Sequence, residues 1–192
     1  DEDEDMVRSR LGKFRDTILE CFAIKDKLSE TRWEKVRNNF LKSIEIQNPA
    51  IDMRKCDSFC ISDTSNAGCQ ITYRDEREVN GTIDFSKTFA KLSSIVFFMH
   101  FVDWRKYIRQ NKKLCFVFKT DNLHQKSFVE LQFPKSGRNC KHAIVTGENQ
   151  IALSDFGAEP EDFQQVKEIC FLFEKDKEKQ HTRIAIQNLR IE

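Results

Sequence analysis

The sequence predicts a mainly β protein: a jelly-roll-type antiparallel β-sandwich preceded by a pair of amphipathic helices. Two observations predict the sandwich. In residues 114–119 and 127–133 large apolar residues occupy every second position, which is the period of a β-strand. From residue 59 to the end, short segments with this period follow one another with turn residues between them, as in all-β sandwiches.

The first 46 residues have a helical period instead. Leu11, Phe14, Ile18 and Phe22 recur at intervals of three or four, so residues 6–28 are expected to form an amphipathic helix. A second helix is expected from the capping box that Thr31 begins, and it should end before Pro49, because proline cannot continue a helix. We therefore expect two domains, a helical extension at 1–46 and a β-sandwich at 47–192.

The sandwich is expected to contain about ten strands, as the even spacing of the alternating segments indicates. Asn80-Gly81 has the form of a hairpin turn, and the apolar phase changes in the last strand, which predicts a bulge at Gln187-Asn188. The expected strands are residues 59–62, 69–74, 82–85, 95–101, 114–119, 127–133, 142–146, 150–153, 167–173 and 182–191.

Charge and cysteine content limit the classes of partner. The 32 basic residues balance 31 acidic ones, so the net charge of +1 gives no general attraction to nucleic acid, and we expect no specific nucleic-acid partner. No apolar run approaches the ~20 residues of a membrane span. The seven cysteines include no C-x-x-C pair and lie mostly at strand positions, which favours free thiols and a cytoplasmic location. Secretion stays open should a leader precede Asp1.

Several segments of the chain resemble the galactose-binding-like sandwich domains that include many carbohydrate-binding modules. The similarity covers about residues 60–192 and does not include the expected helices. It implies a non-catalytic module that binds a glycan and serves as an accessory domain of a larger protein. The segments that carry the resemblance are DWRKY at 103–107, LCFVFKTD at 114–121, VELQF at 129–133, VKEICFLF at 166–173 and IAIQNLRI at 184–191.

Candidate ligand-binding residues fall into two groups. Trp104 and Tyr107 could stack on a sugar ring, although aromatic residues at such positions commonly pack on the core instead. The second group consists of polar residues within expected strands that could point out of the sandwich, where a solvated sheet face is the simpler interpretation. These residues are Tyr73, Arg74, Glu130, Gln132 and Arg183.

No motif predicts catalysis, a metal site or a cofactor. Asp103, Glu130 and Asp155 could supply an acid–base pair, but the sequence gives no spacing that would join two of them. Asp52, Asp57 and Glu192 are weak candidates for a calcium site of the kind found in the resembling family. We therefore expect a protein that is not an enzyme and carries no metal or cofactor.

A second functional hypothesis rests on the outer side of the central strands. Val96, Phe98 and Phe128 are apolar on the face that should point away from the core, as are Cys170 and Leu172. The helices of residues 6–46 could cover this face. The chain would then be a protein-interaction or sensor-type domain, and self-association through the helices would be a further consequence.

Overall fold

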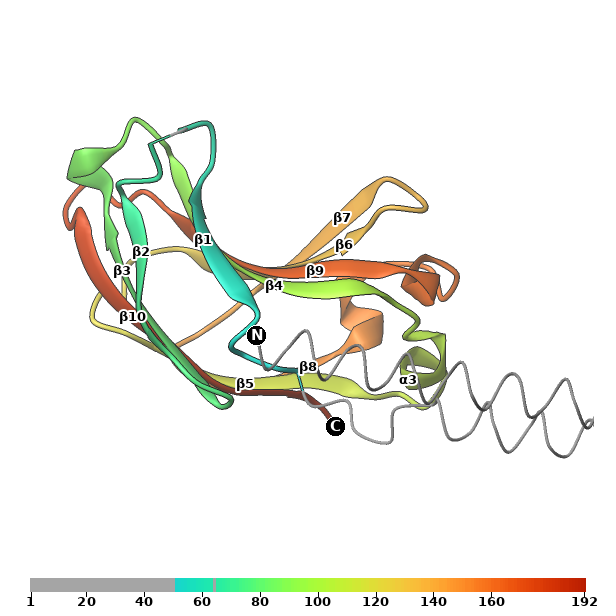
Figure 1. Ribbon diagram of the computed structural model, residues 1–192. Coiled ribbons are helices and arrows are strands. Elements are labelled where there is room, and N and C mark those ends of the chain that lie inside the picture. The colour runs from blue at the N-terminus through green and yellow to red at the C-terminus, as the bar shows by residue number, and fades with distance from the viewer. Residues whose placement is uncertain (1–50, 64) are drawn as a thin grey trace, which may run out of the picture. The chain divides into compact units, whose positions relative to one another are not determined.

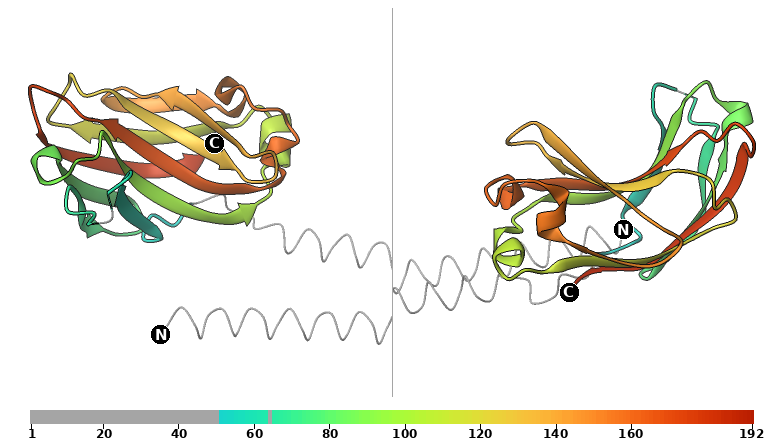
Figure 2. Two further views of the ribbon diagram at one scale, coloured as in Figure 1. Left: turned by 90° about the horizontal axis from the view of Figure 1, so that it is seen from above. Right: turned by 180° about the vertical axis from the view of Figure 1, so that it is seen from behind.

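The computed structural model describes residues 51–63 and 65–192, and in this part of the chain two five-stranded antiparallel sheets face each other. Figure 1 shows the two layers from the side, and Figure 2 shows them from above and from behind. The predicted sandwich is thus confirmed. The predicted helices at residues 6–46 lie outside the described residues.

The first sheet has the order β1-β4-β9-β6-β7, and the second has the order β2-β3-β10-β5-β8. Neighbours in each sheet are mostly not consecutive in the chain, as expected for a jelly roll. The strands of the first sheet are β1 (Cys56–Cys60), β4 (Leu92–Val102), β9 (Val166–Glu174), β6 (Ser127–Phe133) and β7 (Arg138–Ala143). Those of the second are β2 (Cys69–Arg74), β3 (Glu78–Asp84), β10 (His181–Ile191), β5 (Lys113–Thr120) and β8 (Gly147–Ala152).

The connections between strands contain short helices. The helix α3 (Arg105–Arg109) joins β4 to β5. No helix between these two strands was predicted from the sequence. The remaining short helices are the 3-10 turns η1 (Phe85–Lys87), η2 (Leu153–Phe156) and η3 (Asp162–Gln164). In the described part of the chain, no helix is long and apolar enough to cross a membrane.

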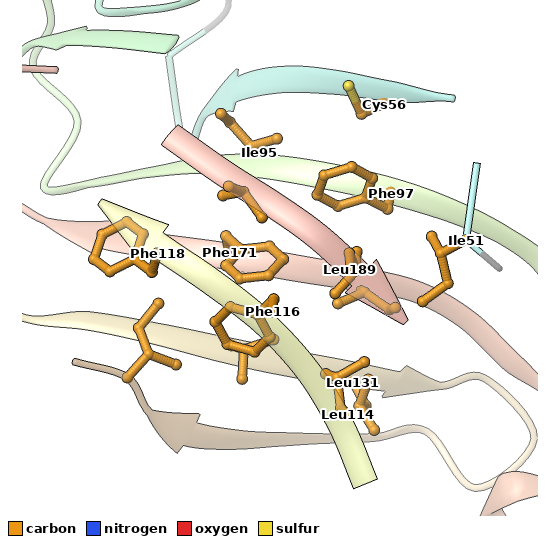
Figure 3. Close-up of a cluster of buried hydrophobic side chains, with 14 of the residues drawn as sticks. Ile51, Cys56, Ile95, Phe97, Leu114, Phe116, Phe118, Leu131, Phe171 and Leu189 are labelled. Atoms are coloured by element: carbon orange, nitrogen blue, oxygen red, sulfur yellow. The ribbon is translucent and has the colours of Figure 1, made fainter. Parts of the chain in front are cut away.

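The core fills the space between the sheets with the inward residues of both, including many phenylalanines (Figure 3). Phe171 of β9 is completely buried and packs edge-on against Phe116 of the opposite sheet, with 4.9 Å between the ring centroids. It also meets Phe97 of β4 at 5.7 Å. Each buried aromatic side chain contributes about 1.5–3 kcal/mol relative to exposure, so these rings hold the two layers together.

The bulge predicted in the last strand is confirmed. The pairing of β10 with β5 shifts register between Gln187 and Arg190, and Asn188 has a φ of 54°, in the left-handed region that asparagine tolerates. Because the extra residue changes the phase, Ile186, Leu189 and Ile191 are all buried.

The turn predicted at Asn80-Gly81 is wrong, because both residues lie within β3 and pair with β2 and β10. Gly81 faces the core, where a Cβ atom would come within 3.1 Å of Ile95 Cδ1 and 3.2 Å of the Gln70 carbonyl oxygen. This glycine therefore marks close packing between the layers, not a reversal of the chain.

The bounds of several other strands were misplaced as well, most clearly those of β1 and β7. The first strand ends at Cys60, close to where residues 59–62 were expected to begin, and β7 covers Arg138–Ala143 instead of residues 142–146. β7 is an edge strand with mostly exposed polar residues, so apolar alternation does not reveal it. The six described cysteines are all free and buried.

Candidate functional site

A groove of about 440 Å³ lies on the outer face of the first sheet. In Figure 1 the β6–β7 hairpin and strand β1 rise on either side of β4 and β9, and the view from behind in Figure 2 shows the same curvature. The groove follows this concave face. Its lining comes from all five strands of the sheet or from the residue that follows β1.

Cross-strand pairing determines how the groove is arranged. Gln132 of β6 pairs with Asn139 of β7 on one side and with Glu168 of β9 on the other, and Glu168 pairs in turn with Phe98 of β4. One row across the sheet is therefore polar and ends on an aromatic ring. Because directly opposed side chains lie about 4.5–5.5 Å apart at Cβ, these residues act as neighbours.

A second row, further along the strands, is mostly apolar. Phe128 pairs with Leu172, Leu172 with Ser94, and Ser94 with Phe59 of β1. Phe59 and Phe98 have exposed fractions of 41% and 36%, and Ile61, two residues after Phe59, has 42%. The groove thus offers exposed aromatic and aliphatic surface along one wall and hydrogen-bonding groups along the other.

The polar groups on the floor form a short network. Gln132 Nε2 donates to Glu130 Oε1 at 3.5 Å and to Cys170 Sγ at 3.4 Å, and Cys170 Sγ donates to Glu168 Oε2 at 3.9 Å. Glu168 also forms an ion pair with Lys167, with 3.1 Å between Nζ and Oε1. The network fixes the amide and the two carboxylates on one patch of floor.

Burial raises the pKa of two of these groups. It raises the pKa of the Glu130 carboxyl, and the hydrogen bond from Gln132 and the charge of Lys141 oppose this effect. Burial, followed by the charges of Glu168 and Glu130, raises the pKa of the Cys170 thiol to about 12. Cys170 is therefore a neutral donor at physiological pH and not a nucleophile.

The structure brings two of the seven predicted ligand-binding residues together. Glu130 and Gln132 both line the groove. Three others belong to the second sheet: Tyr73 and Arg74 lie on β2, and Arg183 lies on β10. The seven residues therefore do not share one surface, because the sequence alone does not say which strands are neighbours.

The three residues of the second sheet have separate surroundings. The Tyr73 hydroxyl donates to Asp75 Oδ2 at 2.7 Å, and Arg74 Nη1 donates to the carbonyl oxygen of Cys56 at 2.7 Å, which ties β2 to β1. Arg183 lines a shallow hollow of about 580 Å³ on the outer face of the second sheet.

The two aromatic candidates do not face the groove. Trp104 immediately precedes α3, is only 4% exposed and belongs to the main core, so it has no free face for a sugar. Tyr107 lies in α3 and packs partly buried against the same core. Both aromatic residues therefore pack on the core, which is the alternative that the sequence analysis gave for them.

Sequence reasoning assigned no binding role to Phe59, Ile61, Phe98, Asn139 or Glu168. The alternation in the sequence places the apolar Phe98 on the outer face of its strand, and this outward aromatic side chain is the signal that could have identified a binding role. The predicted outer apolar residues Val96, Cys170 and Leu172 form a small buried cluster of their own, separate from the main core, and Leu92 and Phe128 pack against it. Among residues 51–63 and 65–192, no group of three His, Cys, Asp or Glu side chains could hold a metal ion.

No protein-family model and no curated protein matches this sequence. Solved structures do share the fold. A family 11 carbohydrate-binding module of a cellulosomal cellulase of Clostridium thermocellum matches with a TM-score of 0.50 and 11% identity, over 77% of this chain and 92% of the module. An exo-β-agarase matches with a TM-score of 0.51 and 8% identity, over 76% of this chain and 25% of the agarase. The chain thus spans about a quarter of that enzyme's length.

The described residues therefore have the fold of a carbohydrate-binding module, in agreement with the galactose-binding-like sandwich that the resemblance predicted.

Proposed function

We propose that this chain is a non-catalytic glycan-binding module and that the groove of the first sheet is its binding surface. The observation that carries the proposal is that one concave face presents both exposed aromatic rings and polar side chains. The rings are those of Phe59 and Phe98, and the polar side chains are Gln132, Asn139 and Glu168. A pyranose ring has an apolar face that packs on an aromatic ring and a rim of hydroxyl groups that need hydrogen-bond partners.

The match to a family 11 carbohydrate-binding module supports this function. The agarase, which the chain covers only in part, is compatible with a role as an accessory domain of a larger protein. Glycan binding at the outer face of the sheet leaves the core intact, and it requires no acid–base pair.

The test is binding to neutral glycans that the matched proteins suggest, namely hexasaccharides of β-1,4-glucan and of agarose, measured by titration calorimetry. We expect binding of at least one of them, and we expect Phe98→Ala to weaken it about tenfold, since losing burial of an aromatic face costs at least ~1.5 kcal/mol. Phe59→Ala should have a similar effect.

Phe89→Ala is the matched control, because Phe89 is 100% exposed and lies in the connection between β3 and β4, outside the groove. This variant should bind as the wild type does. The proposal fails if neither hexasaccharide binds, or if the three phenylalanine variants bind equally well. Thermal melts of all variants separate loss of binding from loss of folding.

A further inference from the structure

Glu130 is the carboxylate of the groove that retains capacity to accept hydrogen bonds. Its Oε1 atom receives one long hydrogen bond, 3.5 Å from Gln132 Nε2, and no hydrogen bond from the described residues reaches Oε2. The side chain lines the groove and is half-buried. A ligand in the groove therefore meets a carboxylate that is partly removed from water and incompletely satisfied.

The other charges near Glu130 are already engaged. Both oxygens of Glu168 have partners, Lys167 for Oε1 and Cys170 for Oε2. Lys141 is the cross-strand neighbour of Glu130, but its Nζ atom lies 4.6 Å from the centroid of the Phe128 ring. None of the described residues that line the groove is a lysine or an arginine. The lining thus offers carboxylates to a ligand and no cation.

Building on the proposed glycan-binding function, we propose that the groove selects sugar chains without acidic groups and that Glu130 is the residue that sets this selectivity. Neutral hydroxyl groups or an amine can donate to the free oxygen of Glu130. A sulfate or carboxylate in the same place cannot donate, and it brings a second negative charge against the first. The groove lining supplies no cation to balance it, since Lys141, whose charge acts on Glu130, is not part of that lining.

The loss of affinity for an acidic sugar can be sized from the short distance between its charge and that of Glu130 in the groove. Two like charges a few ångströms apart near a protein surface repel strongly enough to weaken binding by at least about tenfold. Glu168 contributes less to this repulsion, because Lys167 balances its charge.

The test compares the hexasaccharides of β-1,4-glucan and agarose with sulfated forms of the same two chains, at neutral pH and constant ionic strength. The wild type should bind the neutral form of its preferred backbone at least about tenfold more tightly than the sulfated form. Glu130→Gln keeps the shape of the side chain and removes its charge, so this ratio should fall to about threefold or less. The readout is the ratio of the two affinities, which a general loss of folding does not change.

Glu148→Gln is the matched control, because Glu148 is an exposed glutamate on β8 of the opposite sheet. It should leave the ratio unchanged. The inference is overturned if the wild type binds the sulfated form as tightly as the neutral one, or if Glu130→Gln keeps the wild-type ratio. Binding of none of the four sugars would instead end the proposed function itself, so the two failures are distinguishable.

Discussion

Arg138 Nη1 lies 3.1 Å from Asp162 Oδ2, and this ion pair ties the β6–β7 hairpin to the turn η3. The Asp162 side chain is 9% exposed, and its Oδ2 atom also accepts the backbone N–H of Glu159 at 2.9 Å. Arg138 Nη2 donates in addition to the carbonyl oxygen of Gly157 at 3.0 Å. The pair therefore fixes one wall of the groove to the loop that precedes β9.

Asp162→Asn should lower the free energy of unfolding by about 1–2 kcal/mol at pH 7, because hydrogen bonds to a charged acceptor are lost. Ser136, the Glu159 amide and Arg138 hold the pKa of Asp162 below its usual range. A lowered folded-state pKa stabilises the fold above the unfolded-state value near 3.9, and this contribution is lost as pH falls through the folded-state pKa. Urea titrations at pH 7 and pH 3 should show the difference between wild type and variant shrinking at pH 3. A difference that grows on acidification would contradict the prediction.

Phe171→Ala should destabilise the protein by about 3–5 kcal/mol, because the completely buried ring contacts both Phe97 and Phe116 and its removal leaves a cavity between the sheets. Phe89→Ala removes the same atoms from a fully exposed position and should change stability by less than about 0.5 kcal/mol. Equilibrium denaturation of the two variants measures both values. Equal destabilisation would show that Phe171 does not join the layers as described.

The six cysteine thiols that the structure describes are buried and should react slowly in the native state. Burial raises the pKa of both Cys69 and Cys170 to about 12, so almost no thiolate is present at pH 8. Titration with a thiol reagent should be slow for these six thiols without denaturant, and it should count close to seven thiols after denaturation without reductant. A count of five or fewer would indicate a disulfide and would favour secretion over the cytoplasmic location expected from the sequence.

A fragment of residues 47–192 should fold without the segment that precedes it. The described strands belong to one compact unit, and their core draws its buried residues from both sheets. We expect the fragment to be monomeric, with a melting temperature close to that of the whole chain, in size-exclusion and thermal-melt experiments. Aggregation or binding of a hydrophobic dye would show that residues 1–46 stabilise the sandwich, and would favour the hypothesis in which helices cover its apolar face.

Local alternation was enough to identify most of the strands. The bounds of β2 and β6 agree with the predicted residues 69–74 and 127–133. The interpretation of Gly81 failed because its reason is a contact with Ile95, a residue from the other sheet, and no local pattern reports such a contact. The strand β7 was misplaced because an exposed edge strand needs few apolar residues.

The groove was only partly predictable for a related reason. The alternation in β6 correctly placed Glu130 and Gln132 on an outward face. Their partners Glu168 and Asn139 come from β9 and β7, and only the order of strands in the sheet brings them together. For Trp104 the residue type left both a sugar-stacking role and core packing open, and its burial agrees with core packing.

The position of β10 has a practical consequence for measuring these interactions. This last strand lies in the middle of the second sheet, and Glu192 exchanges two backbone hydrogen bonds with Lys113, at 2.8 and 2.9 Å. The groove belongs to the other sheet. A chain attached to a sensor surface at Glu192 would therefore be held by the layer opposite the groove, which leaves the groove free to meet glycans in solution.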